Sequence, residues 1–127
     1  MAKGKKPPIA KSFGFAFEGI FTGIKKERNM KVHCGMAVLV VIAGIVLKIS
    51  LVEWCICLTL FGLVMALELV NTAIEAVVDL VTQEQKPLAK IAKDTAAGAV
   101  LIAAIMAAIA GCMIFLPKGI LWLTRWF

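Results

Sequence analysis

The fold is decided by the stretch VEWCICLTLFGLVMALELVNTAIEAVVDLV, which occupies residues 52–81. It is almost wholly apolar, and as a helix rising 1.5 Å per residue it would be about 45 Å long. The hydrocarbon core of a bilayer is only about 30 Å thick. The sequence therefore predicts a helix that crosses a membrane and projects from it at one end.

Four polar residues interrupt the second half of this stretch, at spacings of three, four and four: Glu68, Asn71, Glu75 and Asp79. These spacings return to nearly the same side of a helix. A carboxylate at the bilayer centre costs about 2.5–3.5 kcal/mol on insertion scales, so the stripe requires a cation, a metal or a polar cavity. We interpret it as a functional site that runs from the edge of the hydrocarbon into water.

The composition is that of an integral membrane protein with a single domain, residues 1–127. The chain is 61% hydrophobic, and its mean hydropathy of +0.95 is too high for a soluble domain of this size. Three segments are long and apolar enough to span a bilayer. They are residues 32–49, 52–81 and 95–116.

The basic residues are distributed unevenly around these segments. The N-terminal region and the loop after the second span hold eleven of them, from Lys3 to Lys31 and from Lys86 to Lys93, against three on the other side. By the positive-inside rule, the N-terminus and that loop face the cytoplasm. Contacts with anionic lipid explain the net charge of +6 better than nucleic-acid binding does.

The two ends of the chain carry further expectations. Residues 1–8 form a basic tail, and residues 9–28 show the pattern of an amphipathic helix lying on the membrane surface. Residues 117–127 are expected to be an interfacial tail, with Pro117 ending the third helix. Asp94 is expected near the start of the third helix, where a carboxylate interacts favourably with the helix dipole. The apolar side of the surface helix consists of Phe13, Phe17, Ile20, Phe21 and Ile24.

The acidic stripe suits phosphoryl transfer at a membrane surface. Two carboxylates can hold Mg²⁺ together with nucleotide phosphates, and a third can accept a proton from an attacking hydroxyl. Lys93 could neutralise phosphate oxygens, and Glu27 could be a further metal ligand. Spacing alone leaves two other classes open, a small proton-coupled transporter and an accessory subunit. A transporter would favour a carboxylate near mid-membrane and internal repeats.

Several strings resemble the small bacterial integral-membrane diacylglycerol kinase family, which includes undecaprenol kinases. They are ELVNTAIEAVVD at residues 68–79, AKIAKD at 89–94, AGAVL at 97–101, AFEGI at 16–20 and ERN at 27–29. The resemblance implies a homotrimeric bundle in the bacterial cytoplasmic (inner) membrane, with three spans and a surface helix in each subunit. It also implies Mg²⁺- and ATP-dependent phosphorylation of a lipid alcohol.

Carried over by position, the resemblance makes Glu68 the catalytic base and Glu27 and Glu75 the magnesium ligands. The same residues Glu27 and Glu75 then belong to the nucleotide site. The other residues implied to arrange the nucleotide are Asn71, Asp79, Glu84, Lys86, Lys93 and Asp94.

The lipid is expected to be contacted by Lys11, Phe15, His33 and Glu68. The branch specific for diacylglycerol has an acidic residue where His33 stands, a tyrosine near Phe15 and a serine near Ala97. Arg28-Asn29 and His33 resemble the undecaprenol kinase branch instead. Undecaprenol is therefore the expected substrate, with diacylglycerol as the alternative. His33 is given no part in proton transfer.

Overall fold

The computed structural model describes residues 4–127. Expectations that fall on residues 1–3, including the contribution of Lys3 to the charge asymmetry, lie outside the described residues. The chain is all-helical, and three of its helices are long and apolar enough to cross a membrane, as the sequence predicted. The helices are α1 (Ile9–Lys26), α2 (Arg28–Val46), α3 (Leu51–Val81) and α4 (Pro87–Thr124).

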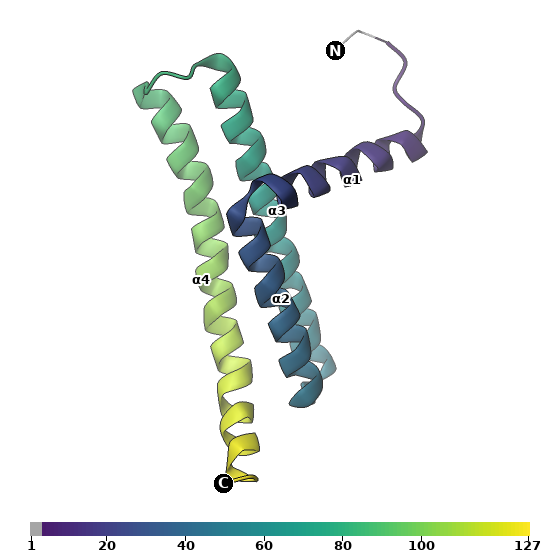
Figure 1. Cartoon of the computed structure of the whole chain (residues 1–127), viewed down its shortest axis with the longest axis vertical. Helices are drawn as coiled ribbons and strands as arrows, with labels where there is room; N and C mark the ends of the chain where they lie inside the picture. The colour runs from purple at the N-terminus through teal and green to yellow at the C-terminus, as the bar shows by residue number, and fades with distance from the viewer. Residues whose placement is uncertain (1–3) are drawn as a thin grey trace.

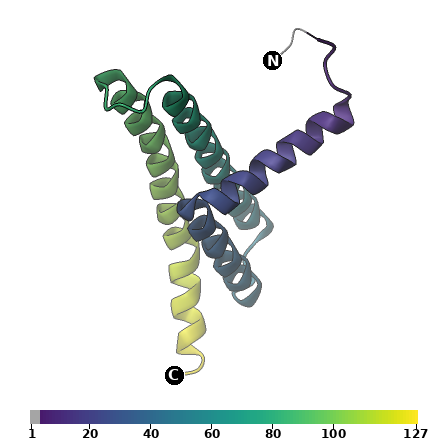
Figure 2. The same ribbon diagram turned by 45° about the horizontal axis from the view of Figure 1, so that its top comes forward.

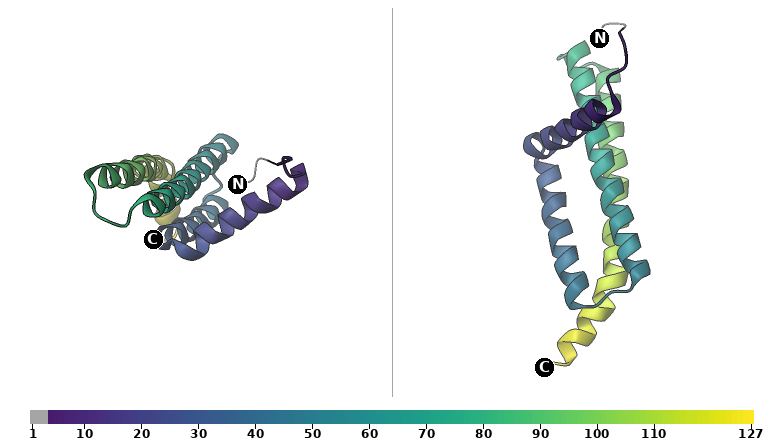
Figure 3. Two further views of the ribbon diagram at one scale, coloured as in Figure 1. Left: turned by 90° about the horizontal axis from the view of Figure 1, so that it is seen from above. Right: turned by 90° about the vertical axis from the view of Figure 1, so that its right-hand side faces the viewer.

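The three long helices lie side by side, and α1 projects sideways from them (Figure 1). Contacts between α3 and α4 form the largest helix interface, and both helices continue well past the level at which α1 leaves the bundle (Figures 1 and 3). In Figure 2, α1 crosses in front of α3, which it also contacts. One end of the α3–α4 pair therefore extends beyond α1 (Figures 1 and 3).

A sharp corner joins α1 to α2 at Glu27, whose backbone is extended (φ −96°, ψ 119°). The corner is fixed against α3 by close packing. A Cβ atom added to Gly23 would lie 2.6 Å from Cδ2 of Leu69, so a larger residue at this position would require the Leu69 side chain to move. Met30, just after the corner, is fully buried (0% exposed). These contacts hold the start of α2 beside the residue that follows Glu68.

The opposite end of the bundle is closed by local polar contacts. The Ser50 hydroxyl accepts from the Glu53 backbone N–H (3.2 Å), and the Ser50 backbone N–H donates to Glu53 Oε2 (2.7 Å). This capping box starts α3. Lys118 Nζ of α4 lies 3.5 Å from Glu53 Oε2, which ties the ends of α3 and α4 together.

Helix α4 differs from the sequence expectation at both ends. It begins at Pro87, because proline suits the first turn of a helix, where its missing N–H needs no acceptor; Asp94 therefore lies inside the helix, and its prediction as a starting residue was wrong. The expected end at Pro117 was also wrong, since the helix continues to Thr124 with Pro117 inside it. Membrane helices tolerate an internal proline because surrounding groups compensate for the lost hydrogen bond.

Candidate active site

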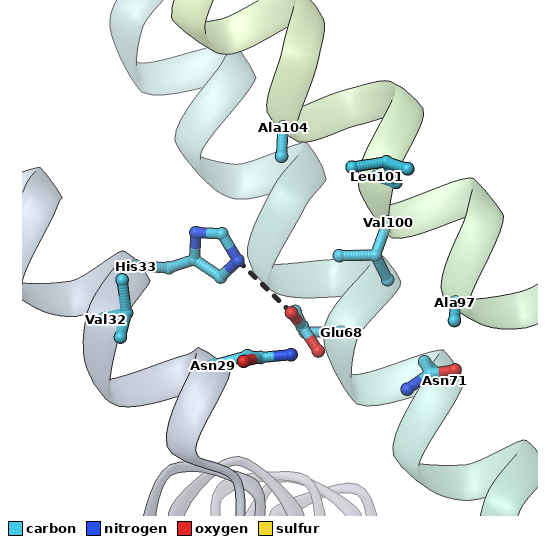
Figure 4. A pocket seen from close by; sticks show the side chains of 9 residues that line it. All are labelled: Asn29, Val32, His33, Glu68, Asn71, Ala97, Val100, Leu101 and Ala104. Carbon is cyan, nitrogen blue, oxygen red and sulfur yellow. Dashed lines mark hydrogen bonds and ion pairs between the residues drawn. The ribbon is translucent and has the colours of Figure 1, made fainter.

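A cavity of about 350 Å³ lies between α2, α3 and α4 (Figure 4). Four polar side chains line it, two from α2 and two from α3, whereas every lining residue of α4 is apolar. This division gives the cavity one wall that can bind a polar group and one that can contact hydrocarbon. The lining residues are Asn29, Val32, His33, Glu68, Asn71, Ala97, Val100, Leu101 and Ala104.

Glu68 is the most buried charged residue in the described chain, with 2% of its surface exposed. Its Oε1 lies 3.2 Å from Nε2 of His33 (Figure 4). Burial of an unpaired carboxylate would cost several kcal/mol, so this hydrogen bond compensates part of the desolvation. The tautomer is inferred from the pairing: if Glu68 is ionised, Nε2 of His33 must carry the hydrogen and donate it.

Asn71 lies one turn further along α3 and is 8% exposed. Its Nδ2 donates to Oε1 of Glu75 at 3.3 Å, whereas its buried Oδ1 has no hydrogen-bond partner among the described residues. If the Asn71 amide were flipped, its oxygen would face the Glu75 carboxylate oxygen, and neither atom could donate. The contact with Glu75 therefore fixes the orientation of the Asn71 amide. A buried acceptor without a donor costs about 1–3 kcal/mol. Such an atom marks a place where a ligand or water can bind.

A second group of polar residues occupies the ends of α3 and α4 that extend beyond α1 and the loop that joins them. Lys93 Nζ lies 2.5 Å from Asp79 Oδ1, and Lys86 Nζ lies 3.0 Å from Glu84 Oε2. Lys90 pairs with Asp94 one turn away on α4. All six side chains are substantially exposed. Exposed ion pairs contribute only about 0.2–1 kcal/mol each. The lysines of these pairs can therefore leave their carboxylates and bind phosphate oxygens at little cost.

The structure brings together only part of the predicted site. His33, Glu68 and Asn71 line one cavity, and Glu75 joins them through Asn71. Glu27 lies at the corner between α1 and α2. Within residues 4–127, no group of three or more His, Cys, Asp or Glu side chains is placed to hold a metal ion.

The lipid-contact residues predicted on α1 do not line the cavity. Phe15 is 59% exposed, Lys11 is also exposed, and neither belongs to the cavity wall. Sequence reasoning missed Asn29, although Asn29 and His33 are four residues apart on one helix and therefore share a face. It also missed the contact of His33 with the proposed base.

Comparisons with known proteins place the chain in a family. Residues 14–115 match the model of the family described as prokaryotic diacylglycerol kinase. An undecaprenol kinase of Bacillus subtilis is 48% identical over 108 residues, which cover 85% of this chain and 88% of that protein. A diacylglycerol kinase of Synechocystis is 44% identical over 112 residues, covering 87% of this chain but 64% of that protein. The diacylglycerol kinase of Escherichia coli K12 is 32% identical over 106 residues, or 84% and 87% of the two chains.

The family match covers most of the chain and includes every lining residue of the cavity. It confirms the resemblance found in the sequence and favours a kinase over a transporter or an accessory subunit. A kinase requires a nucleotide as phosphoryl donor, and these relatives together with the three apolar helices indicate a bacterial membrane protein that acts on a lipid. The chain therefore belongs to the prokaryotic diacylglycerol kinase family and is a membrane lipid kinase.

Proposed function

We propose that this protein transfers the γ-phosphoryl group of ATP to undecaprenol, with Mg²⁺, at the cytoplasmic surface of the membrane. The observation that carries the proposal is Glu68: a carboxylate that is 2% exposed and lines a cavity with an apolar wall. Such a residue can meet the hydroxyl of a lipid whose hydrocarbon stays in the membrane. General bases of this kind contribute about 10²–10⁴-fold to rate.

The apolar wall on α4 suits the part of the lipid next to its hydroxyl group. Val100 and Leu101 face the cavity from α4, opposite His33 and Glu68. An isoprenoid alcohol places its first apolar carbons directly beside the hydroxyl, whereas diacylglycerol has polar ester groups there. Similarity to the undecaprenol kinase of Bacillus subtilis, at 48% identity, also favours undecaprenol. Diacylglycerol remains the alternative substrate.

The magnesium and nucleotide site is proposed to lie between this cavity and the exposed ends of α3 and α4. Mg²⁺ uses one or two protein carboxylates and completes its six ligands with water and phosphate oxygens. Glu27 and Glu75 fit that requirement as oxygen donors, and the Asn71 amide occupies only Oε1 of Glu75. When bound, the ion would neutralise charge on the transferred group. The exposed residues Asp79, Glu84, Lys86, Lys93 and Asp94 are proposed to arrange the nucleotide.

The assembly is proposed to be a homotrimer in which subunits share sites, with α1 lying on the cytoplasmic surface of the membrane. Exposure of α1 supports its placement: Phe13, Phe17 and Phe21 are each more than half exposed in the isolated chain. Such aromatic side chains require lipid or another subunit around them. The excess of basic residues at the N-terminus and in the loop after α3 supports the cytoplasmic orientation.

A lipid panel tests the proposal. Purified protein in detergent or lipid is supplied with labelled ATP, Mg²⁺ and either undecaprenol or diacylglycerol at equal mole fraction. We expect kcat/KM to be higher for undecaprenol, and Glu68→Gln to abolish product with both lipids. A higher kcat/KM for diacylglycerol would make the alternative correct, and phosphorylation of neither lipid would refute both substrates.

A further inference from the structure

The cavity contains two titratable side chains, one from each of two helices. Among its lining residues, α2 supplies His33 and α3 supplies Glu68, whereas Asn29 and Asn71 are neutral amides. Helix α4 contributes only apolar side chains, and α1 contributes none to the wall. The next carboxylate, Glu75, lies on the far side of the Asn71 amide, which donates to it. No other described charged group lines the cavity and competes for the hydrogen bond between His33 and Glu68.

The two side chains differ in their access to solvent. The Glu68 side chain is 3% exposed and the His33 side chain is 22% exposed. Figure 4 shows Nε2 of His33 directed at Glu68, with the second ring nitrogen turned away from it. Of the two carboxylate oxygens, Oε1 is paired with the ring at 3.2 Å, and Oε2 receives no hydrogen bond from any described residue. The histidine thus occupies one oxygen and leaves the other available.

We propose that His33 is the positioning residue of Glu68: by donating its Nε2 hydrogen to Oε1, it holds the buried carboxylate in place and directs Oε2 to the lipid hydroxyl. This inference rests on the proposed role of Glu68 as the base. It goes beyond the sequence-based expectation that His33 contacts the lipid, and it leaves His33 without a part in proton transfer.

The proton balance of the step keeps His33 unchanged. The lipid O–H bond breaks as the hydroxyl oxygen forms a bond to the γ-phosphorus, and the proton goes to Oε2 of Glu68. The bond between the γ-phosphorus and its bridging oxygen breaks, and the nucleoside diphosphate leaves with that electron pair. Throughout this step His33 retains its Nε2 hydrogen, which stabilises the ionised base before the transfer. Hydrogen bonds to a charged form favour that form.

Three substitutions at position 33 separate hydrogen bonding from packing. In His33→Gln, the side-chain amide nitrogen can take the place of Nε2 as a donor. His33→Leu removes the donor and keeps an apolar volume. His33→Glu places a second carboxylate beside Glu68, and two acids this close share one proton. We propose to measure kcat and KM for ATP in the 127-residue chain carrying each variant.

The expected results depend on whether residue 33 can still donate a hydrogen bond to Glu68. His33→Gln should keep kcat within about fivefold of wild type, because a neutral donor remains. His33→Leu should lower kcat by about 10- to 100-fold, since hydrogen bonds to charged groups carry that range. His33→Glu should lower kcat at least as much, because a second acid beside Glu68 competes with the lipid hydroxyl for the base. KM for ATP should change little in all three.

A spectroscopic readout separates this inference from the proposed function. The carboxyl bands of Glu68, obtained as the infrared difference between the wild type and Glu68→Gln, report its hydrogen bonding without substrate. We expect these bands to change position in His33→Leu and to match wild type in His33→Gln. Infrared bands and kcat values of His33→Leu and His33→Glu that both match wild type would overturn the inference.

Two unfavourable results, a variant that does not fold and a lipid assay without product, still allow a conclusion. If His33→Leu does not fold, the opposing expectations for His33→Gln and His33→Glu decide the question in the same way. If neither lipid is phosphorylated but the infrared band shifts as expected, the proposed substrate is wrong while the positioning of Glu68 by His33 stands.

Discussion

Acidic residues on α3 occupy two environments that differ in what holds them. Glu68 is buried, lies 3.2 Å from His33 and opens to a cavity made by three helices of one chain. Asp79 belongs to the extended end, where its side chain is 53% exposed and pairs with Lys93. A pair in a low-dielectric interior is costly to break, whereas an exposed pair is screened by water and salt.

This difference is consistent with separate roles for the buried and the exposed acidic residues of α3. The proposed lipid end is a cavity formed by three helices of one chain, and the hydrogen bond between His33 and Glu68 joins two of these helices. The proposed nucleotide end consists of exposed pairs that a bound phosphate, a metal ion or a neighbouring subunit can rearrange. Substitutions at the cavity should therefore alter catalysis strongly, and substitutions at the exposed end should act mainly on nucleotide binding.

The largest effect is expected at the buried end. Glu68→Gln keeps the size of the side chain and removes the base, so kcat should fall by about 10²–10⁴-fold. Affinity for MgATP and the thermal unfolding temperature should remain close to wild type, because the amide can still bond to His33. Turnover assays, nucleotide titration and thermal unfolding check these three points. A variant with near-normal kcat would show that Glu68 is not the base.

Between the two ends, Glu27→Ala and Glu75→Ala should each raise the magnesium concentration needed for half-maximal rate, by about 10-fold or more. The reason is the loss of one of the few protein oxygen ligands available to the ion. Magnesium titrations at saturating ATP measure the effect, with Glu18→Ala on α1 as a matched control. Curves for both variants that overlay wild type would exclude both carboxylates as ligands.

A smaller effect is expected from filling the empty acceptor of Asn71. In Figure 4 the Asn71 oxygen lies on the side of α4 that carries Ala97. Ala97→Ser places a hydroxyl there, which can donate to Oδ1 and stabilise the fold by about 1 kcal/mol, the typical net value of a hydrogen bond. The unfolding temperature should rise by a few degrees. Ala104→Ser, further along the same wall, is the control and should give no increase; an equal rise in both variants would contradict the assignment.

The smallest effect on stability is expected at the exposed pair. A double-mutant cycle with Asp79→Asn and Lys93→Met should give a coupling energy below about 1 kcal/mol, as for other exposed pairs. The same cycle on Lys90 and Asp94 provides a matched comparison. KM for ATP should nevertheless rise in Lys93→Met, because a charge for phosphate is lost. A coupling energy of several kcal/mol would show that the extended end is as tightly fixed as the cavity.

Sequence predicted the helices better than the contacts between them. The expected stretch 52–81 agrees with α3, Leu51–Val81, because apolar length and the Ser50 cap both define its start. Pro117 was misread as a break, since proline is acceptable inside a membrane helix. This error concerns the local environment of the proline, which sequence alone does not supply.

The residues of the candidate site were predicted from their types and from the resemblance. The hydrogen bond that pairs His33 with Glu68 was not predicted. Spacing placed Glu68, Asn71 and Glu75 on one face of α3, and the hydrogen bond between Asn71 and Glu75 is consistent with that. The contact of His33 with Glu68 joins residues 35 positions apart, and no helical period relates them. Only the packing of α2 on α3, fixed by Gly23 and Met30 at the corner, brings them together.

The close approach of Gly23 to Leu69 also fixes the position of Glu68 relative to α1. If α1 lies on the membrane surface as proposed, Glu68 is held next to that plane, where the hydroxyl of a membrane alcohol already resides. The substrate then need not leave the bilayer, and it reaches the enzyme by lateral diffusion in two dimensions. Its effective concentration is its mole fraction among the surrounding lipids, so dilution with inert lipid should slow the reaction even when the total amount of substrate is constant.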